Sequence, residues 1–301
     1  MKILITGATG LIGTALSQAL TADGHHLVVL TRNPARATLS ARATAYAWQP
    51  EREPPPLAAF EDVTAVIHLA GENVAVRWTA ERKRRIRDSR VLGTRNLVLG
   101  MQQCPMPPSI FIAGSAVGLY GDRGDEQLTE QAAPGQGFLV DVCREWEAES
   151  EQAQAFGART VALRTGVVLS RAGGALKTML PAFQCGVAGK LGDGRQWFPW
   201  IHSADIVGLT QHALLNEGVR GPLNAVAPNP VTNAEFTKEL AAVLHRPALI
   251  PVPKFALELL FGEMAEVLLA SQRVVPEAAL QSGYQFRFPM LREALRELFS
   301  K

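Results

Sequence analysis

The first thirteen residues join a short apolar segment to three glycines at positions 7, 10 and 13. Residues 2–6 are typical of a buried strand, and residues 11–23 repeat apolar side chains at helical spacing. A strand, a Gly-x-x-Gly-x-x-Gly turn and a helix in this order are typical of a dinucleotide-binding site. Gly7 permits the tight turn, Gly10 lets backbone N–H groups approach a pyrophosphate, and Gly13 allows close packing of helix on strand. We therefore expect phosphates to meet the N-terminus of this helix.

The residues that follow the second expected strand indicate which dinucleotide is bound. The apolar run over 26–31 ends about 20 residues after the glycines, where an NAD-specific site places Asp or Glu against the ribose 2′-hydroxyl. This chain has Thr31, Arg32 and Asn33 there. A guanidinium suits a 2′-phosphate and offers no acceptor to a bare ribose. The predicted cofactor is therefore NADP(H), and the alternative is that Arg32 is a solvated loop residue.

Length and composition are those of a globular protein. The 301 residues are enough for one large α/β domain with an appended lobe, and 47% of them are hydrophobic, which excludes a disordered chain. The 30 basic and 28 acidic residues leave a net charge of +2, so no global field favours nucleic acid or an anionic membrane as a partner. The basic run over 81–87 is typical of a solvated helix face.

Cysteine and histidine usage argues against disulfides and metals. Cys104, Cys143 and Cys185 are an odd number without C-x-x-C spacing, which fits reduced thiols in a cytosol. The six histidines form no zinc pattern. Met1 leads directly into the first strand, which leaves no room for a signal peptide, and residues 255–270 are interrupted by three glutamates, as in an amphipathic helix. We therefore expect a cytoplasmic protein without a bound metal or a membrane span.

Strand-like runs alternate with helical stretches along the first 170 residues. Further strands are expected over 63–69, 109–113 and 160–163, and long helices over 79–103 and 141–156. This alternation predicts an α/β fold with a Rossmann-like, doubly wound parallel sheet. The Pro-rich segment 50–56 is predicted to be a surface connection between elements.

After residue 170 the pattern loosens, with a glycine-rich stretch over 186–194 and aromatic residues over 195–202. We expect a smaller lobe there, over the carboxyl edge of the sheet, where open α/β sheets bind ligands. The predicted division is a Rossmann domain over 1–170, with returning segments over 203–227, and a substrate-side lobe and tail over 171–301.

Several segments resemble known proteins. Residues 7–13, 66–71, 114–115 and 164–168 resemble the extended short-chain dehydrogenase/reductases. More narrowly, residues 70–73, 89–90, 198–202 and 224–228 resemble the nucleoside-diphosphate-sugar epimerase-like proteins of the YfcH type. The tail over 246–286 is similar to the small domain of unknown function that closes that family. The resemblance covers nearly the whole chain and implies a Rossmann fold, an NAD(P) cofactor, and oxidoreductase or epimerase chemistry on a carbonyl or sugar-like small molecule.

The resemblance also implies a role for individual residues. The implied contacts are Gly7, Gly10, Leu11, Ile12 and Gly13 with the pyrophosphate, Thr31 and Arg32 with the 2′-phosphate, Leu69 and Ala70 with the adenosine side, and Val168 near the nicotinamide. Arg90 stands where ordinary extended relatives have Asn and would reach the cofactor diphosphate, with Arg85 as a companion. The alternative is that Arg90 is a helix-surface arginine.

The catalytic pair of this family is missing from the sequence. Short-chain reductases pair a Tyr with a Lys four residues later, so that the ammonium lowers the pKa of the phenol. The residues four positions after the three tyrosines are Pro50, Gly124 and Phe288. When the helix is anchored on Trp146, the two positions of the pair hold Leu139 and Cys143. Neither side chain replaces the acid–base chemistry, which usually contributes about 10²–10⁴-fold to the rate.

Other polar residues are candidates for the missing role. Ser115 follows the fifth strand, where relatives have a substrate-side hydroxyl, and Tyr120 lies in a turn that resembles the active-site edge of epimerases. We predict Ser115 and Tyr120 as catalytic residues with Tyr120 as the proton donor, and the alternative for Tyr120 is a residue that covers the core. Three further residues are candidates for a role in the active site, each with a structural alternative. Asp141 would otherwise lie on a solvated helix face, Cys143 would be a small buried core residue, and Glu72 would cap a loop.

Two groups near residue 200 also stay open. His202 and Asp205 match a motif of the family, but local capping or pairing is the alternative. The second group consists of the aromatic residues Trp197, Phe198 and Trp200. One interpretation is that they line a pocket for a flat or apolar substrate, and the other is that they pack the core of the lobe.

Two functions are compatible with these observations. We favour an enzyme that passes hydride between NADPH and a small-molecule carbonyl or sugar-like substrate. The alternative is a non-catalytic NADPH-binding sensor or regulatory protein, which the vacant Tyr and Lys positions favour. The sequence makes no prediction of substrate identity or of oligomeric state.

Overall fold

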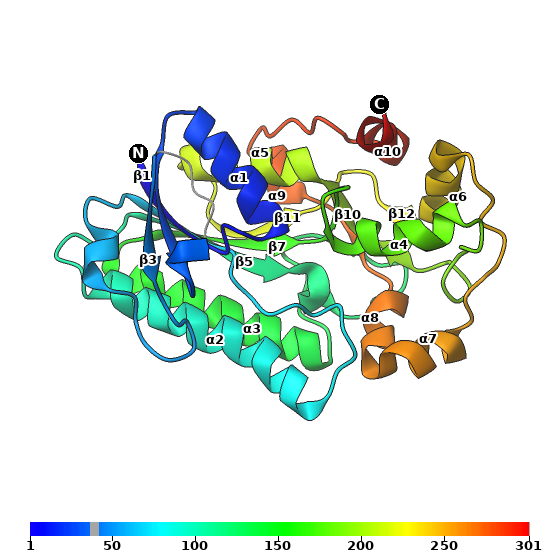
Figure 1. The fold of residues 1–301 in the computed structure, drawn as a ribbon, viewed down its shortest axis with the longest axis horizontal. Coiled ribbons are helices and arrows are strands. Elements are labelled where there is room, and N and C mark those ends of the chain that lie inside the picture. Colours follow the sequence, from blue (N-terminus) through cyan, green and yellow to red (C-terminus); the bar gives the residue numbers. More distant parts are fainter. Residues whose placement is uncertain (37–41, 301) are drawn as a thin grey trace.

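The computed structural model describes residues 1–36 and 42–300. Seven parallel strands form the central sheet in the order β11-β7-β5-β4-β1-β2-β3 (Figure 1). The strands are β1 (Lys2–Thr6), β2 (His26–Thr31), β3 (Ala43–Ala47), β4 (Ala65–His68), β5 (Ile110–Ala116), β7 (Arg159–Thr165) and β11 (Gly221–Ala225). The strand order reverses at β1, which is the doubly wound arrangement of a Rossmann-like sheet. The predicted fold class is therefore confirmed.

Helices cover both faces of the sheet (Figure 1). The helices α2 (Ala80–Gln102) and α3 (Phe138–Glu151) pack together on one face, and α1 (Leu11–Ala22) and α5 (Ser203–Leu215) pack together on the other. Because successive strand residues point to opposite faces, β1 supplies Ile3 and Ile5 to the core under α1, and Leu4 to the core under α2. The sheet is thus buried on both sides, as parallel sheets are.

The expected elements differ from the observed ones mainly at their ends. The helix expected over 79–103 is α2, and the one expected over 141–156 begins three residues earlier, at Phe138, and ends in a 3₁₀ turn over Gln152–Phe156. The amphipathic helix expected over 255–270 is broken into α7 (Lys254–Phe261), a 3₁₀ turn and α8 (Ala265–Leu269). The break falls at Gly262, whose φ of +61° ends a helix.

A smaller helical unit lies beside the carboxyl edge of the sheet. It contains α4 (Gly174–Gln184), α6 (Asn233–Leu244) and α10 (Leu291–Phe299), with two short strand pairs. The pairs are β8 (Val167–Leu169) with β10 (Trp200–His202) and β9 (Trp197–Phe198) with β12 (Val231–Thr232). Trp200 is 1% exposed, and the rings of Phe198 and Phe236 lie 4.5 Å apart in this core. Trp200 and Phe198 therefore pack the core of the lobe together with Phe236. The domain boundary at residue 170 stays a prediction.

The C-terminal segment returns to the sheet domain and is held there by polar contacts. Its strand β13 (Arg273–Val274) pairs with β6 (Gln127–Leu128), and the short helix α9 (Glu277–Gln281) follows. The buried Asp205 carboxylate accepts the backbone N–H groups of Arg287 at 2.7 Å and Phe288 at 3.0 Å. Asp205 thus anchors the tail. In the part of the chain that the structure describes, no helix is both long and apolar enough to cross a membrane.

Candidate functional site

A cavity of about 550 Å³ opens where β1, β2, β3 and β4 end. This volume is typical of small-molecule sites, which span about 300–1,000 Å³. Six of the predicted cofactor contacts line it: Gly7, Gly10, Thr31, Arg32, Leu69 and Ala70. The cavity therefore brings together the glycine turn, the residues after β2 and the residues after β4.

The glycine turn depends on the absence of side chains at two positions. Gly7 has a φ of +70°, and a Cβ there would lie 2.7 Å from the carbonyl carbon of Leu69. A Cβ on Gly13 would lie 2.1 Å from the carbonyl oxygen of Gly7. Gly13 is thus a packing position at the base of α1, and it does not line the cavity, nor do its helix neighbours Leu11 and Ile12. The turn brings the loop after β4 and the start of α1 close together.

The N-terminus of α1 is open to an anion. Gly10 is the N-cap residue and supplies no side-chain hydrogen bond, and the first turn carries no acidic residue. The first backbone N–H groups of a helix have no partner within the helix and carry a partial positive charge, so they donate hydrogen bonds to water or to a ligand. A phosphate group fits this position.

A buried polar triad fixes the end of β4 beside the turn. The Thr6 hydroxyl oxygen accepts the N–H of Ala70 at 3.1 Å and lies 2.7 Å from His68 Nδ1. Burial, and to a smaller degree the charge of Arg90, lowers the pKa of His68 to about 3, so the imidazole is neutral. Thr6 and His68 carry no signal of their own in the sequence, because each lies in an apolar strand run.

The loop after β3 forms a wall of the cavity that the sequence analysis missed. Five consecutive residues of this loop, 48–52, line the cavity. The Trp48 N–H donates to the carbonyl of Thr31 at 2.9 Å, and its indole N–H donates to the carbonyl of Glu53 at 2.8 Å. The Pro-rich segment 50–56 overlaps this loop. It connects β3 to the next element, as predicted, but residues 50–52 also line the cavity.

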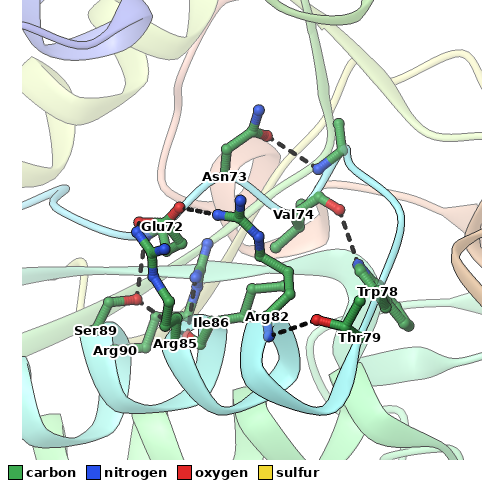
Figure 2. Close-up of polar contacts among 11 residues, drawn as sticks. Glu72, Asn73, Val74, Trp78, Thr79, Arg82, Arg85, Ile86, Ser89 and Arg90 are labelled. Carbon is green, nitrogen blue, oxygen red and sulfur yellow. Dashed lines mark hydrogen bonds and ion pairs between the residues drawn. The ribbon is translucent and has the colours of Figure 1, made fainter.

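Glu72 and two arginines lie beyond the end of β4, where Figure 2 shows the Glu72 carboxylate flanked by Arg82 and Arg85. Arg82 forms an ion pair with Glu72, and Arg85 Nη2 lies 3.6 Å from the second carboxylate oxygen. The backbone N–H of Glu72 donates to the Ser89 hydroxyl at 3.0 Å. Glu72 and Ser89 line the cavity, whereas Arg85, a predicted cofactor contact, does not.

Arg90 is a half-buried cation on the same helix, and like Arg85 it does not line the cavity. Its guanidinium donates to the carbonyl of Ile86 at 3.1 Å, lies 5.2 Å from the centre of the Trp146 ring, and would be 3.2 Å from a Cβ on Gly71. Burial lowers its pKa, and Arg90 forms no ion pair with any residue in 1–36 or 42–300. A charge that is partly shielded from water and has no ionic partner is unfavourable, so this position favours an anionic ligand.

The two predicted catalytic hydroxyls lie in a buried network instead of the cavity. Ser115 donates to Glu147 Oε1 at 2.5 Å, and Tyr120, which is 0% exposed, donates to Asn224 Oδ1 at 2.7 Å. Arg164 donates to both Glu147 oxygens, at 2.9 and 2.8 Å, and to the Tyr120 oxygen at 3.0 Å. Burial raises the pKa of Tyr120. The structure thus favours the packing alternative for Tyr120 and does not support it as a proton donor.

Leu139 and Cys143 occupy the first two turns of α3. Leu139 packs against Gly118, in the 3₁₀ turn over Val117–Tyr120. Cys143 is 4% exposed, and burial, followed by the charge of Glu147, raises its pKa to about 12. A neutral, buried thiol is neither an acid nor a nucleophile at ordinary pH. Cys143 is therefore a core residue.

Val168 and His202 belong to the paired strands β8 and β10, although Val168 packs in the same hydrophobic cluster as Ala8 and Leu69, which line the cavity. Val168 lies opposite Ile201 and does not line the cavity. His202 accepts the N–H of Ala204 through Nδ1 at 3.1 Å and so caps α5, while its Nε2 lies 3.0 Å from Glu297. Residues 1–36 and 42–300 contain no cluster of three His, Cys, Asp or Glu side chains that would hold a metal.

Comparison with known families gives two matches along the chain. Residues 3–225 match the model of the NAD dependent epimerase/dehydratase family. Residues 252–298 match a domain of unknown function, DUF1731, in the region where the sequence analysis expected such a domain. The narrower YfcH-type grouping stays a prediction.

Individual relatives are similar over the full length of the chain. The epimerase family protein YfhF of Bacillus subtilis is 38% identical, over 100% of this chain and 98% of its own. A chloroplastic SDR39U1 homolog of Arabidopsis thaliana is also 38% identical, over 99% of this chain and 86% of its own. Among solved structures, human epimerase family protein SDR39U1 (isoform 2) with NADPH has a TM-score of 0.88, 35% identity and 99% coverage of both chains.

Proposed function

Because the chain belongs to the NAD dependent epimerase/dehydratase family, we propose that it binds NADPH in the cavity at the ends of β1 to β4. The observation that carries the proposal is the cavity, which joins the glycine turn, the open N-terminus of α1 and the Arg32 guanidinium in one space. The human relative that was solved with NADPH supports the choice of cofactor.

The proposed contacts follow from where each residue lies. The diphosphate would meet Gly7, Gly10 and the first turn of α1, and Arg90 would supply the positive charge that its own surroundings leave unpaired. Thr31 and Arg32 would hold the 2′-phosphate, because they lie where β2 ends on the cavity wall. For Leu11, Ile12 and Gly13 we propose contacts through backbone N–H groups only, since none of the three residues lines the cavity. Leu69 and Ala70 would face the adenosine.

We further propose that the protein is an oxidoreductase or epimerase that acts on a carbonyl or sugar-like small molecule. NADPH, when bound, supplies the hydride. Because Leu139 and Cys143 stand at the positions of the Tyr-Lys pair and Tyr120 is buried, water is the proposed proton source for the substrate oxygen. Without a positioned general acid, which contributes about 10²–10⁴-fold, we expect a kcat below roughly 1 s⁻¹.

The second candidate function is a non-catalytic NADPH-binding sensor. The observation that favours it is the network of Ser115 and Tyr120, whose hydroxyl protons are both committed to buried acceptors. In such a protein the cofactor would change the position of the smaller lobe and so signal to a partner. NADPH-dependent turnover of any member of a panel of carbonyls and nucleotide sugars, at a rate above the background without protein, would eliminate this candidate as the sole function.

Arg32→Ala is expected to weaken NADPH binding about 10- to 150-fold, because one charge-assisted hydrogen bond to the 2′-phosphate contributes about 1.5–3 kcal/mol. NADH binding should change little, since its ribose carries no phosphate at that position. Fluorescence titration of both dinucleotides measures the two dissociation constants. Equal losses for NADPH and NADH would remove Arg32 from this role.

Tyr120→Phe is expected to lower the free energy of unfolding by about 1–3 kcal/mol, because Asn224 and Arg164 each lose a buried hydrogen-bond partner. Turnover per folded molecule, measured with NADPH and a panel of carbonyls and nucleotide sugars, should stay within about threefold of wild type, because the hydroxyl does not reach the cavity. A loss in kcat of about 100-fold or more in the folded variant, the scale of general acid catalysis, would restore Tyr120 as the proton donor.

A further inference from the structure

We infer that Arg52 is a second cation for the adenosine 2′-phosphate and acts together with Arg32 from the neighbouring loop. The inference rests on the proposed NADPH site, and it adds a residue that determines the preference for NADPH over NADH. Both arginines line the same cavity, although 20 residues separate them in the sequence.

The sheet brings the two loops together. Strands β2 and β3 are parallel neighbours, with Thr31 opposite Ala47. The N–H of Trp48 then donates to the carbonyl of Thr31 at 2.9 Å, so the backbone is paired up to the last residue before each loop begins. Because parallel strands end at the same edge, Arg32 and Arg52 leave the sheet on the same side and face one space.

Several contacts hold the loop that carries Arg52. The indole N–H of Trp48 donates to the carbonyl of Glu53 at 2.8 Å, which closes the loop on itself. The backbone N–H of Arg52 donates to the carbonyl of Gln49 at 3.0 Å. Helix α2 adds a third contact, since Asn96 Nδ2 donates to the carbonyl of Pro50 at 2.8 Å. A loop ordered in this way loses little conformational entropy when a ligand binds.

The charges of Arg32 and Arg52 are not compensated within residues 1–36 and 42–300. Neither guanidinium makes an ion pair or a side-chain hydrogen bond there, and both residues are exposed. Arg87 and Arg95 are exposed as well, but they form ion pairs with Glu145 and Glu149. Two free guanidinium groups on one cavity wall match a phosphate monoester, which carries a charge of about −1.5 to −2 and accepts bidentate hydrogen bonds.

Glu51 is the one acidic residue of the same loop that lines the cavity. Its carboxylate would instead accept the 2′-hydroxyl of NADH, which makes the opposite cofactor preference the competing outcome. The two loops contribute two cations and one anion, so this part of the wall keeps a net positive charge and favours the phosphate. The other acidic residue of the cavity, Glu72, is already paired with Arg82 and Arg85.

The test is a titration of wild type, Arg52→Ala and Glu51→Gln with NADPH, NADH and 2′,5′-ADP. We expect Arg52→Ala to weaken NADPH and 2′,5′-ADP about 10-fold and to change NADH less than about twofold, as for the loss of one charge-assisted contact. Glu51→Gln should leave NADPH binding unchanged or tighter. Arg195→Ala, an exposed arginine outside the cavity, is the control for lost net charge and should leave all three ligands unchanged.

Two results would overturn the inference while leaving the proposed function intact. In the first, wild type binds NADPH, and the ratio of the NADPH and NADH dissociation constants is the same in Arg52→Ala as in wild type. The other is weaker NADH binding in Glu51→Gln together with a wild-type preference for NADH, which would assign the loop to a bare ribose. If wild type bound neither dinucleotide, the proposed function and the role of Arg52 would both fail.

Discussion

Glu147→Ala is expected to destabilise the folded protein by about 3–5 kcal/mol, because the variant leaves the Arg164 guanidinium buried without its partner. The two side chains are 11% and 9% exposed and 2.8 Å apart. Burial by itself lowers the pKa of the Arg164 guanidinium. The hydrogen bonds and charges of Glu147 and Tyr120 outweigh burial and raise this pKa above its usual value, so Arg164 stays charged in the network. Urea denaturation followed by circular dichroism measures the change in the free energy of unfolding.

A matched control lies two residues earlier on the same helix. Glu145 pairs with Arg87 at 2.5 Å, but these side chains are 40% and 46% exposed, so Glu145→Ala should change stability by less than about 1 kcal/mol. Glu147→Gln should fall between the two, because the amide keeps an acceptor for Ser115 but loses the charge. If Glu147→Ala were as mild as the control, the network would not hold β5, α3 and β7 together.

The central strands of the sheet were predictable because they are buried on both faces. Two of these strands contain continuous apolar runs, Ile3-Leu4-Ile5 and residues 27–30. Such runs can be recognised as buried strands from the sequence alone. The edge strands were not located from the sequence. Apart from Tyr46, β3 consists of small residues, and all five positions are half-buried or exposed. β11 begins with Gly221 and Pro222, which are rare inside strands but tolerated at an edge.

The glycine turn of the site could be predicted because local sequence specifies its backbone. A Cβ at Gly7 or Gly13 would meet backbone atoms of the turn, and with Gly10 these glycines fall within seven consecutive residues. The surroundings of Ser115 and Tyr120 could not be predicted in the same way. Their partners Glu147, Arg164 and Asn224 come from three other elements, and only the folded chain shows that these hydroxyls are already bonded.

The loop over 48–52 was misjudged for a similar reason. The prolines over 50–56 predict a surface connection, and this segment overlaps the loop and does connect two elements, but it carries no sign that residues 48–52 line a site. Its place on the cavity wall follows from the pairing of β2 with β3, and that pairing leaves no local signal in the sequence. Residues that line a site through strand pairing are therefore found only after the sheet order is known.

Gly13→Ala is expected to destabilise the protein by about 3 kcal/mol or more, although alanine is the better helix former by about 1 kcal/mol. The added Cβ would lie 2.1 Å from the carbonyl oxygen of Gly7 and 2.8 Å from the Cα of Ala8. Both atoms belong to the backbone of the turn, so no side chain can rotate away to relieve the contact. To relieve the contact, either α1 moves away from β1 or the turn opens. Each change also moves Gly7, which lines the cavity.

Gly10→Ala separates stability from binding in the same turn. The nearest atom to a Cβ on Gly10 is the carbonyl oxygen of Gly7 at 3.2 Å, and its φ of −79° suits any residue, so stability should fall by less than about 1 kcal/mol. Gly10 lines the cavity, however, and the methyl group would occupy space that the proposed diphosphate needs. Gly10→Ala should therefore lose NADPH affinity while it keeps its unfolding midpoint, and Gly13→Ala should lose both. If Gly10→Ala bound NADPH as wild type does, the diphosphate would not lie against this turn.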